Sequence, residues 1–247
     1  MKRIKLVVAY DGTNYNGWQI QPNGITIEGI LNQALTELTG EPIIVVGASR
    51  TDSGVHSLGN VAVFDTNTRM PSEKISYALN QRLPEDIVVQ NSCEVPSDFH
   101  PRRCKSRKTY EYKILNRKFP MPLRRYDTYF YYRKLDVELM RQAAGHLIGE
   151  HDFKSFCSIH SQADTTVRTI YELSVVEDQD MIVIRVTGSG FLYNMVRILA
   201  GTLIQAGIGE IQPEDMPGIL SACDRSAAGP TAPAHGLTMV GIVFEEM

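Results

Sequence analysis

The sequence has few cysteines, and none of the four is placed for a shared metal site. Cys93, Cys104, Cys157 and Cys223 form no C-x-x-C pair and have no histidine at zinc-finger spacing. The chain also lacks any uncharged run of about 18 residues, the length of a membrane-spanning helix. The apolar run after Lys5 ends at Asp11, too early for a secretion signal. These absences argue against a disulfide framework, a structural zinc site and a membrane protein, and they predict a cytoplasmic protein.

An overall positive charge is missing as well, because the formal net charge is −3. Residues 101–134 nevertheless carry twelve of the 25 Lys and Arg residues against two acidic ones, which gives this segment a charge of +10. Eight of the twenty aromatic residues lie in it too. Cations neutralise phosphates and aromatic rings stack on unpaired bases, so the segment fits a surface for looped RNA. A solvated strand pair with aromatic cross-strand contacts explains it equally well.

The first hundred residues show strand and helix patterns in a recognisable order. The expected elements are a strand over Lys2–Ala9, a helix over Thr26–Thr39 capped by Thr26 and stopped by Gly40, a buried central strand over Pro42–Val46, a strand over Val61–Phe64, a helix over Glu73–Leu83 and a strand over Ile87–Val89. This β-α-β-β-α-β order is that of the ferredoxin-like unit, which many RNA-binding sheets share.

The pattern restarts after Pro96 and Pro101, which predicts a first domain over 1–100 and a second over 101–247. The second half is expected to hold strands over Thr109–Leu115 and Thr128–Tyr132, a helix over Val137–Ile148, a hairpin of Ile170–Val176 with Met181–Val186, helices over Leu192–Ala206 and Pro213–Ala222, and a strand over Leu237–Phe244. The predicted fold class is α+β. Two ferredoxin-like subdomains would join in a mostly antiparallel central sheet, with helices on one side and an active-site cleft between them.

Between the second and third strands lies an unusually polar loop, residues 49–57. Its carboxylate, Asp52, follows a predicted buried strand and precedes Gly54, which allows a tight turn. A carboxylate held in this way suits nucleophilic catalysis. An Asx-turn or a simple surface charge is the alternative interpretation.

This loop is one of seven motifs in which the chain resembles the tRNA pseudouridine synthases of the A type, nearly from end to end. The motifs are Tyr10-Asp11-Gly12-Thr13 with Tyr15, Gly17-Trp18-Gln19 and Gln21-Pro22-Asn23; Gly47-Ala48-Ser49-Arg50-Thr51-Asp52-x-Gly54-Val55-His56; Phe99-His100 through Lys108-x-Tyr110-x-Tyr112; His151-Asp152-Phe153-x-Ser155-Phe156; Arg168-x-Ile170; Gly188-x-Gly190-Phe191-Leu192-Tyr193-Asn194-Met195-Val196-Arg197; and Ala232-Pro233-Ala234-His235-Gly236-Leu237. Ser53, Ser57, Pro101 and Cys104 depart from the family's usual small residues.

The resemblance implies that the protein isomerises uridine to pseudouridine, without metal or cofactor. It assigns the nucleophile to Asp52 and the cation beside it to Arg197. It assigns stacking on the uracil to Tyr110 and leaves open whether Tyr110 is also the base that removes the C5 proton. We expect Arg50 either to brace the position that the flipped base vacates or to contact a phosphate. Leu237 would line the pocket or belong to the core. The basic residues Lys108, Arg124 and Arg125 are expected to bind the RNA.

The resemblance further implies that the substrate is the anticodon arm of tRNA, at uridines 38, 39 and 40, and that the enzyme is a homodimer. His56 and His235 are weak evidence for a metal site, because no acidic cluster accompanies them in the sequence and the resemblance implies no metal. A non-catalytic module that binds structured RNA is the alternative, but it would not need the Asp52 loop. A glycosidase would need a second acidic residue as proton donor, which no motif supplies.

Overall fold

The chain divides into two compact units in a computed structural model that describes residues 1–159, 161 and 163–245. Unit 1 comprises Met1–Ser106 together with the end of the chain from Met239 onward, and unit 2 comprises Arg107–Thr238. The fold class is α+β and the strand pairing is mostly antiparallel, as the sequence predicts. Most of the closing strand, from Met239 onward, belongs to the first unit although it lies at the other end of the sequence.

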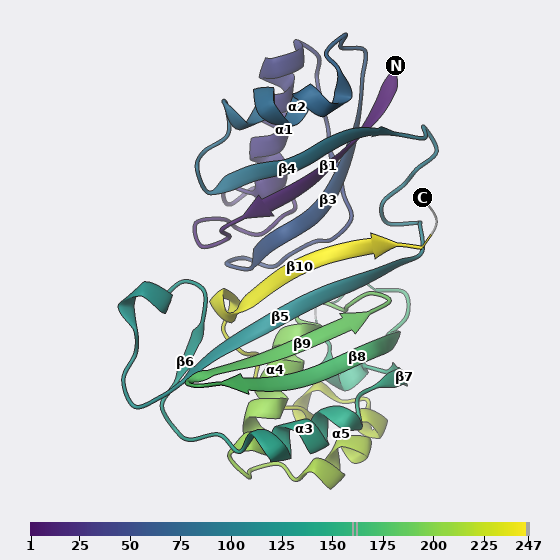
Figure 1. Cartoon of the computed structure of the whole chain (residues 1–247). Coiled ribbons are helices and arrows are strands. Elements are labelled where there is room, and N and C mark those ends of the chain that lie inside the picture. The colour runs from purple at the N-terminus through teal and green to yellow at the C-terminus, as the bar shows by residue number, and fades with distance from the viewer. Residues whose placement is uncertain (160, 162, 246–247) are drawn as a thin grey trace. The chain divides into compact units, whose positions relative to one another are not determined.

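Unit 1 has the predicted β-α-β-β-α-β order of elements, of which Figure 1 labels β1, α1, β3, α2 and β4. Its elements are β1 (Lys2–Tyr10), α1 (Ile27–Thr39), β2 (Val46–Gly47), β3 (His56–Thr66), α2 (Ser72–Asn80) and β4 (Ile87–Val95), completed by β10 (Leu237–Phe244) from Met239 onward. The strands follow the order β4-β1-β3-β10, and β2 pairs with β3. Both neighbours of β1 are antiparallel to it.

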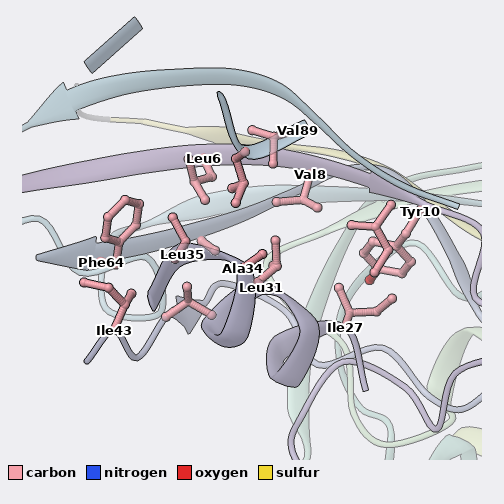
Figure 2. Packing of buried hydrophobic residues seen from close by; sticks show 14 of the residues in the cluster. Leu6, Val8, Tyr10, Ile27, Leu31, Ala34, Leu35, Ile43, Phe64 and Val89 are labelled. Carbon is pink, nitrogen blue, oxygen red and sulfur yellow. The ribbon is translucent and has the colours of Figure 1, made fainter. Parts of the chain in front are cut away.

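The core of unit 1 lies between the sheet and helices α1 and α2, and Figure 2 shows the part that packs against α1. Alternate residues of β1, including Leu6 and Val8, are buried and face Leu31 and Leu35 of α1. The helix begins and ends as predicted: the Thr26 side chain accepts the N–H of Gly29, and Gly40 takes the left-handed conformation that stops it.

The predicted central strand over Pro42–Val46 is wrong. Only Val46–Gly47 forms a strand, and Ile44 is 76% exposed. The cause is α1, whose side chains take the main-chain donors of this run: Asn32 accepts the N–H of Val45 at 2.8 Å and Thr36 accepts that of Ile43 at 3.0 Å. The run therefore lies along the helix, and its alternate residues, not all of them, are buried.

Unit 2 repeats this plan with additions (Figure 1). Its elements are β5 (Ser106–Asn116), β6 (Tyr129–Tyr131), α3 (Val137–Gly145), β7 (Gly149–Asp152), β8 (Val167–Asp178), β9 (Met181–Gly188), α4 (Met195–Gly207) and α5 (Met216–Ala222). The strand order is β5-β9-β8-β7, with β6 parallel to β5. Leaving β6 and β7 aside, β5-α3-β8-β9-α4 repeats the first five steps of the ferredoxin-like order.

The predicted β8–β9 hairpin is confirmed, with Gln179 in the left-handed conformation at its turn. Other parts of unit 2 differ from the prediction. Gly149–Asp152 is a strand, β7, where no element was predicted, because a glycine and three polar residues paired at one edge of a sheet carry no apolar alternation. Helix α4 begins at Met195 and not at Leu192, because Asn194 has a φ of 60° and interrupts the helical backbone.

Candidate active site

Asp52 lies half-buried in the bend between β2 and β3. Its main-chain carbonyl accepts the N–H of Val55 at 3.2 Å, which closes a tight turn. Thr51, the preceding residue, is buried and is held twice: its carbonyl accepts the N–H of Trp18 at 3.1 Å, and its hydroxyl lies 2.7 Å from the Tyr10 hydroxyl. Trp18 is fully buried, so the turn is anchored to the core of unit 1.

Ser53 and Gly54, on the other side of Asp52, are hydrogen-bonded to Tyr15. Its carbonyl accepts the N–H of Gly54 at 3.3 Å and the hydroxyl of Ser53 at 3.2 Å. Its own hydroxyl donates to Asp86 at 2.5 Å, and burial together with that carboxylate raises the pKa of Tyr15. The residues on both sides of Asp52 therefore have fixed main-chain partners.

Two glycines make this close approach possible. A Cβ on Gly17 would lie 2.5 Å from the Thr51 carbonyl oxygen, and Gly17 has a φ of +81°. A Cβ on Gly12 would lie 2.0 Å from the Val55 carbonyl oxygen. The sequence placed Gly12 and Gly17 in a family motif, but it did not show that this motif packs against the main chain of the Asp52 loop.

His56 ends the loop and is buried against Asp11 and Gly12. Its Nδ1 lies 3.0 Å from Asp11 Oδ1 and 3.1 Å from the Gly12 nitrogen. When Nδ1 carries a proton it donates to the carboxylate, and when it does not it accepts the Gly12 N–H. Burial raises the pKa of Asp11, but the Thr13 hydroxyl and N–H and the contact with His56 outweigh it and leave that pKa below its usual value.

Arg50 is exposed and projects from the same fixed frame. The Asn60 side chain donates to the carbonyl of Ser49 at 3.0 Å, so the main chain is held on both sides of Arg50, at Ser49 and at Thr51. The Arg50 side chain is thus exposed and is carried by a main chain that is held in place.

In unit 2, Tyr110 is buried on β5 and pairs across the sheet with Val186. Its ring meets that of Phe191 edge to face, with 5.2 Å between centroids. Lys108 lies two residues earlier on β5, half-buried and opposite Gly188. Phe191 and Gly188 belong to the motif that leads to Arg197, so two motifs far apart in the sequence meet here.

Arg197 lies on the first turn of α4 and is only partly exposed. Its Nε donates to the Ala232 carbonyl and its Nη1 to the Asn194 side chain, both at 2.8 Å. The Ala232 nitrogen in turn donates to the Arg197 carbonyl at 3.1 Å. These bonds fix the guanidinium, and they join α4 to the last motif of the sequence.

Tyr112 is a residue of this group that the sequence analysis did not single out. It is fully buried, its hydroxyl donates to the Pro233 carbonyl at 2.8 Å, and a Cβ on Gly236 would lie 2.7 Å from its ring. Burial, then Tyr129, raises the pKa of Tyr112, and the charge of Arg197 opposes them. Leu237, which follows Gly236, is also buried. The second tyrosine of the K-x-Y-x-Y motif was the available signal.

Arg124 and Arg125 lie elsewhere in unit 2, on the exposed connection between β5 and β6. Arg124 pairs with Asp127 at 2.9 Å, and the Arg125 guanidinium lies 4.1 Å from the ring centroid of Tyr126.

Asp52 belongs to unit 1, whereas Tyr110 and Arg197 belong to unit 2. That these three side chains lie together in one site therefore stays a prediction. Among the described residues, no group of three or more His, Cys, Asp or Glu is arranged to hold a metal, and no helix is long and apolar enough to cross a membrane.

The fold alone does not define an activity, and the comparisons with known proteins identify the class of enzyme to which this chain belongs. The family described as tRNA pseudouridine synthase matches residues 6–102 and 143–245. Proteins named tRNA pseudouridine synthase A are similar over 99% of this chain and 100% of their own length: those of Thermoanaerobacter sp. (strain X514) and Acetivibrio thermocellus are 47% identical, and that of Geotalea uraniireducens is 45% identical. The chain belongs to the tRNA pseudouridine synthase family and is an isomerase of this type.

Proposed function

We propose that this enzyme converts uridine to pseudouridine in the anticodon stem-loop of tRNA, at positions 38, 39 and 40, with Asp52 as the nucleophile. The observation that favours Asp52 most strongly is the set of hydrogen bonds that holds its turn in place. The turn that carries it is half-buried and bonded through Thr51, Ser53 and Gly54 to the segment after β1. A surface carboxylate in an ordinary turn does not need such hydrogen bonds to a distant segment.

The reaction itself explains why one carboxylate is enough. Pseudouridine forms when the C1′–N1 bond breaks, the uracil turns in place and a C1′–C5 bond forms, so no electrons or groups are gained or lost. Asp52 would attack either C1′ of the sugar or C6 of the uracil, and an ionised carboxylate can both add and leave. The proton on C5 must then be removed and N1 must gain one, so that the product is an isomer of the substrate.

A carboxylate in a closed pocket takes up a proton unless a cation accompanies it. We assign this role to Arg197, whose guanidinium is held by the Ala232 carbonyl and the Asn194 side chain and has little freedom to turn away. Tyr110 would stack on the uracil. An unperturbed phenol, with a pKa near ~10, is a poor base at neutral pH, so stacking is the role we assign it.

A uridine in the duplex stem must leave its stack to reach Asp52, which costs about a few kcal/mol. Arg50 would hold the opened RNA beside the nucleophile, and Leu237 would form an apolar wall of the pocket. Lys108, Arg124 and Arg125 would bind phosphates, because they lie on the most basic segment of the chain. We also propose a homodimer that acts in the cytoplasm, where one tRNA would touch both subunits.

The direct test is Asp52→Asn, assayed by tritium release from C5-labelled uridine in tRNA and, separately, by tRNA binding. We expect release to be abolished and affinity to stay nearly intact. Asp178→Asn, an exposed carboxylate at the end of β8, is the matched control and should keep full activity. Full activity in Asp52→Asn would remove Asp52 from the mechanism. Loss of binding alone would favour a module that only binds RNA.

A further inference from the structure

Arg102, in the turn that follows β4, is joined to the strand that leads into the Asp52 loop. Its Nε donates to the carbonyl of Gly47 at 2.7 Å, across 55 positions of sequence. Gly47 lies on β2 and packs so closely on Trp18 that a Cβ would lie 2.3 Å from the indole nitrogen. Because Trp18 is fully buried, the Arg102 guanidinium is attached to a rigid part of unit 1.

Arg102 also has a neighbour of the same charge. Burial, and then the positive charge of Arg50, lower the pKa of Arg102, and Glu28 acts in the opposite direction. One Glu28 oxygen already accepts the N–H of Ile20 at 2.9 Å. The guanidinium groups of Arg50 and Arg102 together carry more positive charge than the Glu28 carboxylate can balance. Like charges repel each other, so a further anion bound between them would be favourable.

Both arginines are exposed, and the bond to Gly47 uses only the Nε of Arg102. The two Nη groups at the end of the fork suit a phosphate, which arginine binds in a bidentate manner. We infer that Arg102 binds a phosphate of the RNA strand that carries the target uridine, beside the Asp52 loop. The inference rests on the proposed function and adds to it a second RNA-binding arginine in unit 1.

Arg102→Gln separates the charge from the bond to Gly47, because Nε2 of glutamine can occupy the place of Nε of arginine and donate to the same carbonyl. We expect tRNA affinity to fall about ten-fold and the slope of log K against log salt to flatten by about one, as for one lost phosphate contact. The turnover rate at saturating tRNA should not change, because a phosphate contact holds ground state and transition state equally.

Arg82→Gln is the matched control, because Arg82 is an exposed arginine of unit 1 that also donates to one carbonyl, that of Ala78. It should bind tRNA like the unaltered protein, with the same salt slope. Wild-type affinity and slope in Arg102→Gln would overturn the inference. So would weaker binding with an unchanged slope and a lower melting temperature, because the residue would then only support the loop.

This result is independent of the nucleophile if binding is measured without turnover, in the Asp52→Asn background as well as in the active enzyme. An active Asp52→Asn enzyme would end the proposal for Asp52 and leave the Arg102 measurement valid. Unaltered binding in Arg102→Gln would end the inference and leave Asp52 in place.

Discussion

The carbonyl oxygen of Thr51 accepts a hydrogen bond from the main-chain nitrogen of Trp18 at 3.1 Å, so the residue before the proposed nucleophile is bonded to a fully buried tryptophan. The two residues are 33 positions apart. Such a long-range main-chain bond sets the position of Asp52 independently of the exposed side chains around it. Activity should therefore depend on residues that never touch the RNA.

Gly17→Ala tests this dependence. The new Cβ would lie 2.5 Å from the Thr51 carbonyl at a φ of +81°, so the loop must move. A displacement of about 1 Å can lower activity by about a hundred-fold, and we expect a loss of kcat/KM of that order, measured by tritium release. Gly40→Ala has a similar φ of +72° but nothing within 4 Å, so it should lose about 1 kcal/mol of stability and keep its activity. Equal activities would contradict the idea.

Asp11 predicts how stability depends on pH. Its pKa in the folded protein lies below the unfolded value, because the bonds from Thr13 and His56 outweigh the effect of burial. The stabilisation is therefore present above the unfolded pKa of about 3.9 and is lost as pH falls through the folded value. Because half of the side chain is exposed, Asp11→Asn should cost only about 0.5 to 1 kcal/mol at pH 7.

The measurement is urea unfolding of both proteins at pH 7 and at pH 3. The difference between them should shrink at the lower pH. Thr13→Val removes the hydroxyl that donates to Asp11 at 2.6 Å and should reproduce part of the effect. If the difference in free energy of unfolding between the two proteins grows as pH falls, the direction given for the Asp11 pKa shift is wrong.

Arg197→Lys and Arg197→Gln examine the proposed cation. Lysine keeps the charge but offers one nitrogen where arginine uses two, Nε toward Ala232 and Nη1 toward Asn194, so it cannot reproduce this geometry and we expect at least a ten-fold loss of kcat/KM. Glutamine removes the charge as well, and Asp52 would then protonate more readily. The acid limb of the pH–rate profile should move to higher pH in this variant only. A profile that does not move would separate Arg197 from the ionisation of the nucleophile.

Tyr110 and Tyr112 should behave differently although they are two residues apart on β5. Tyr110→Phe keeps a ring that can stack, so its activity should stay within about ten-fold of the original, whereas Tyr110→Leu should lose more. If phenylalanine is as inactive as leucine, the hydroxyl takes part in the chemistry. Tyr112→Phe should instead lose about 1 kcal/mol of stability, because the bond to the Pro233 carbonyl disappears.

Arg124 and Arg125 test the basic connection between β5 and β6. Replacing both by alanine should weaken tRNA binding and flatten its salt dependence by about two, because each would release the counterions of one phosphate. Arg141→Ala on α3, whose guanidinium donates to the carbonyl of Val175, is the control. An unchanged slope in the double variant would show that this pair points elsewhere.

Much of the fold follows from local pattern. The α1 helix, its two caps and the β8–β9 hairpin were predictable, because each depends on residues close together in the sequence. The run 42–46 was not, because Asn32 and Thr36 take its main-chain donors and no apolar pattern reports such bonds. The contacts that hold the Asp52 loop could not be predicted for the same reason. Its motif was visible, but the contacts join Tyr10, Tyr15 and Trp18 to a loop more than thirty residues later.

The position of β10 has a consequence for synthesis on the ribosome. This strand neighbours β3 in the first unit, yet it is made last. Until residues 239–244 have emerged, the part of the β3 edge that β2 does not pair presents open main-chain donors and acceptors, so the sheet of the nascent first unit is incomplete. A chain that terminates prematurely before this strand should therefore aggregate, even though every residue of the Asp52 loop has been made.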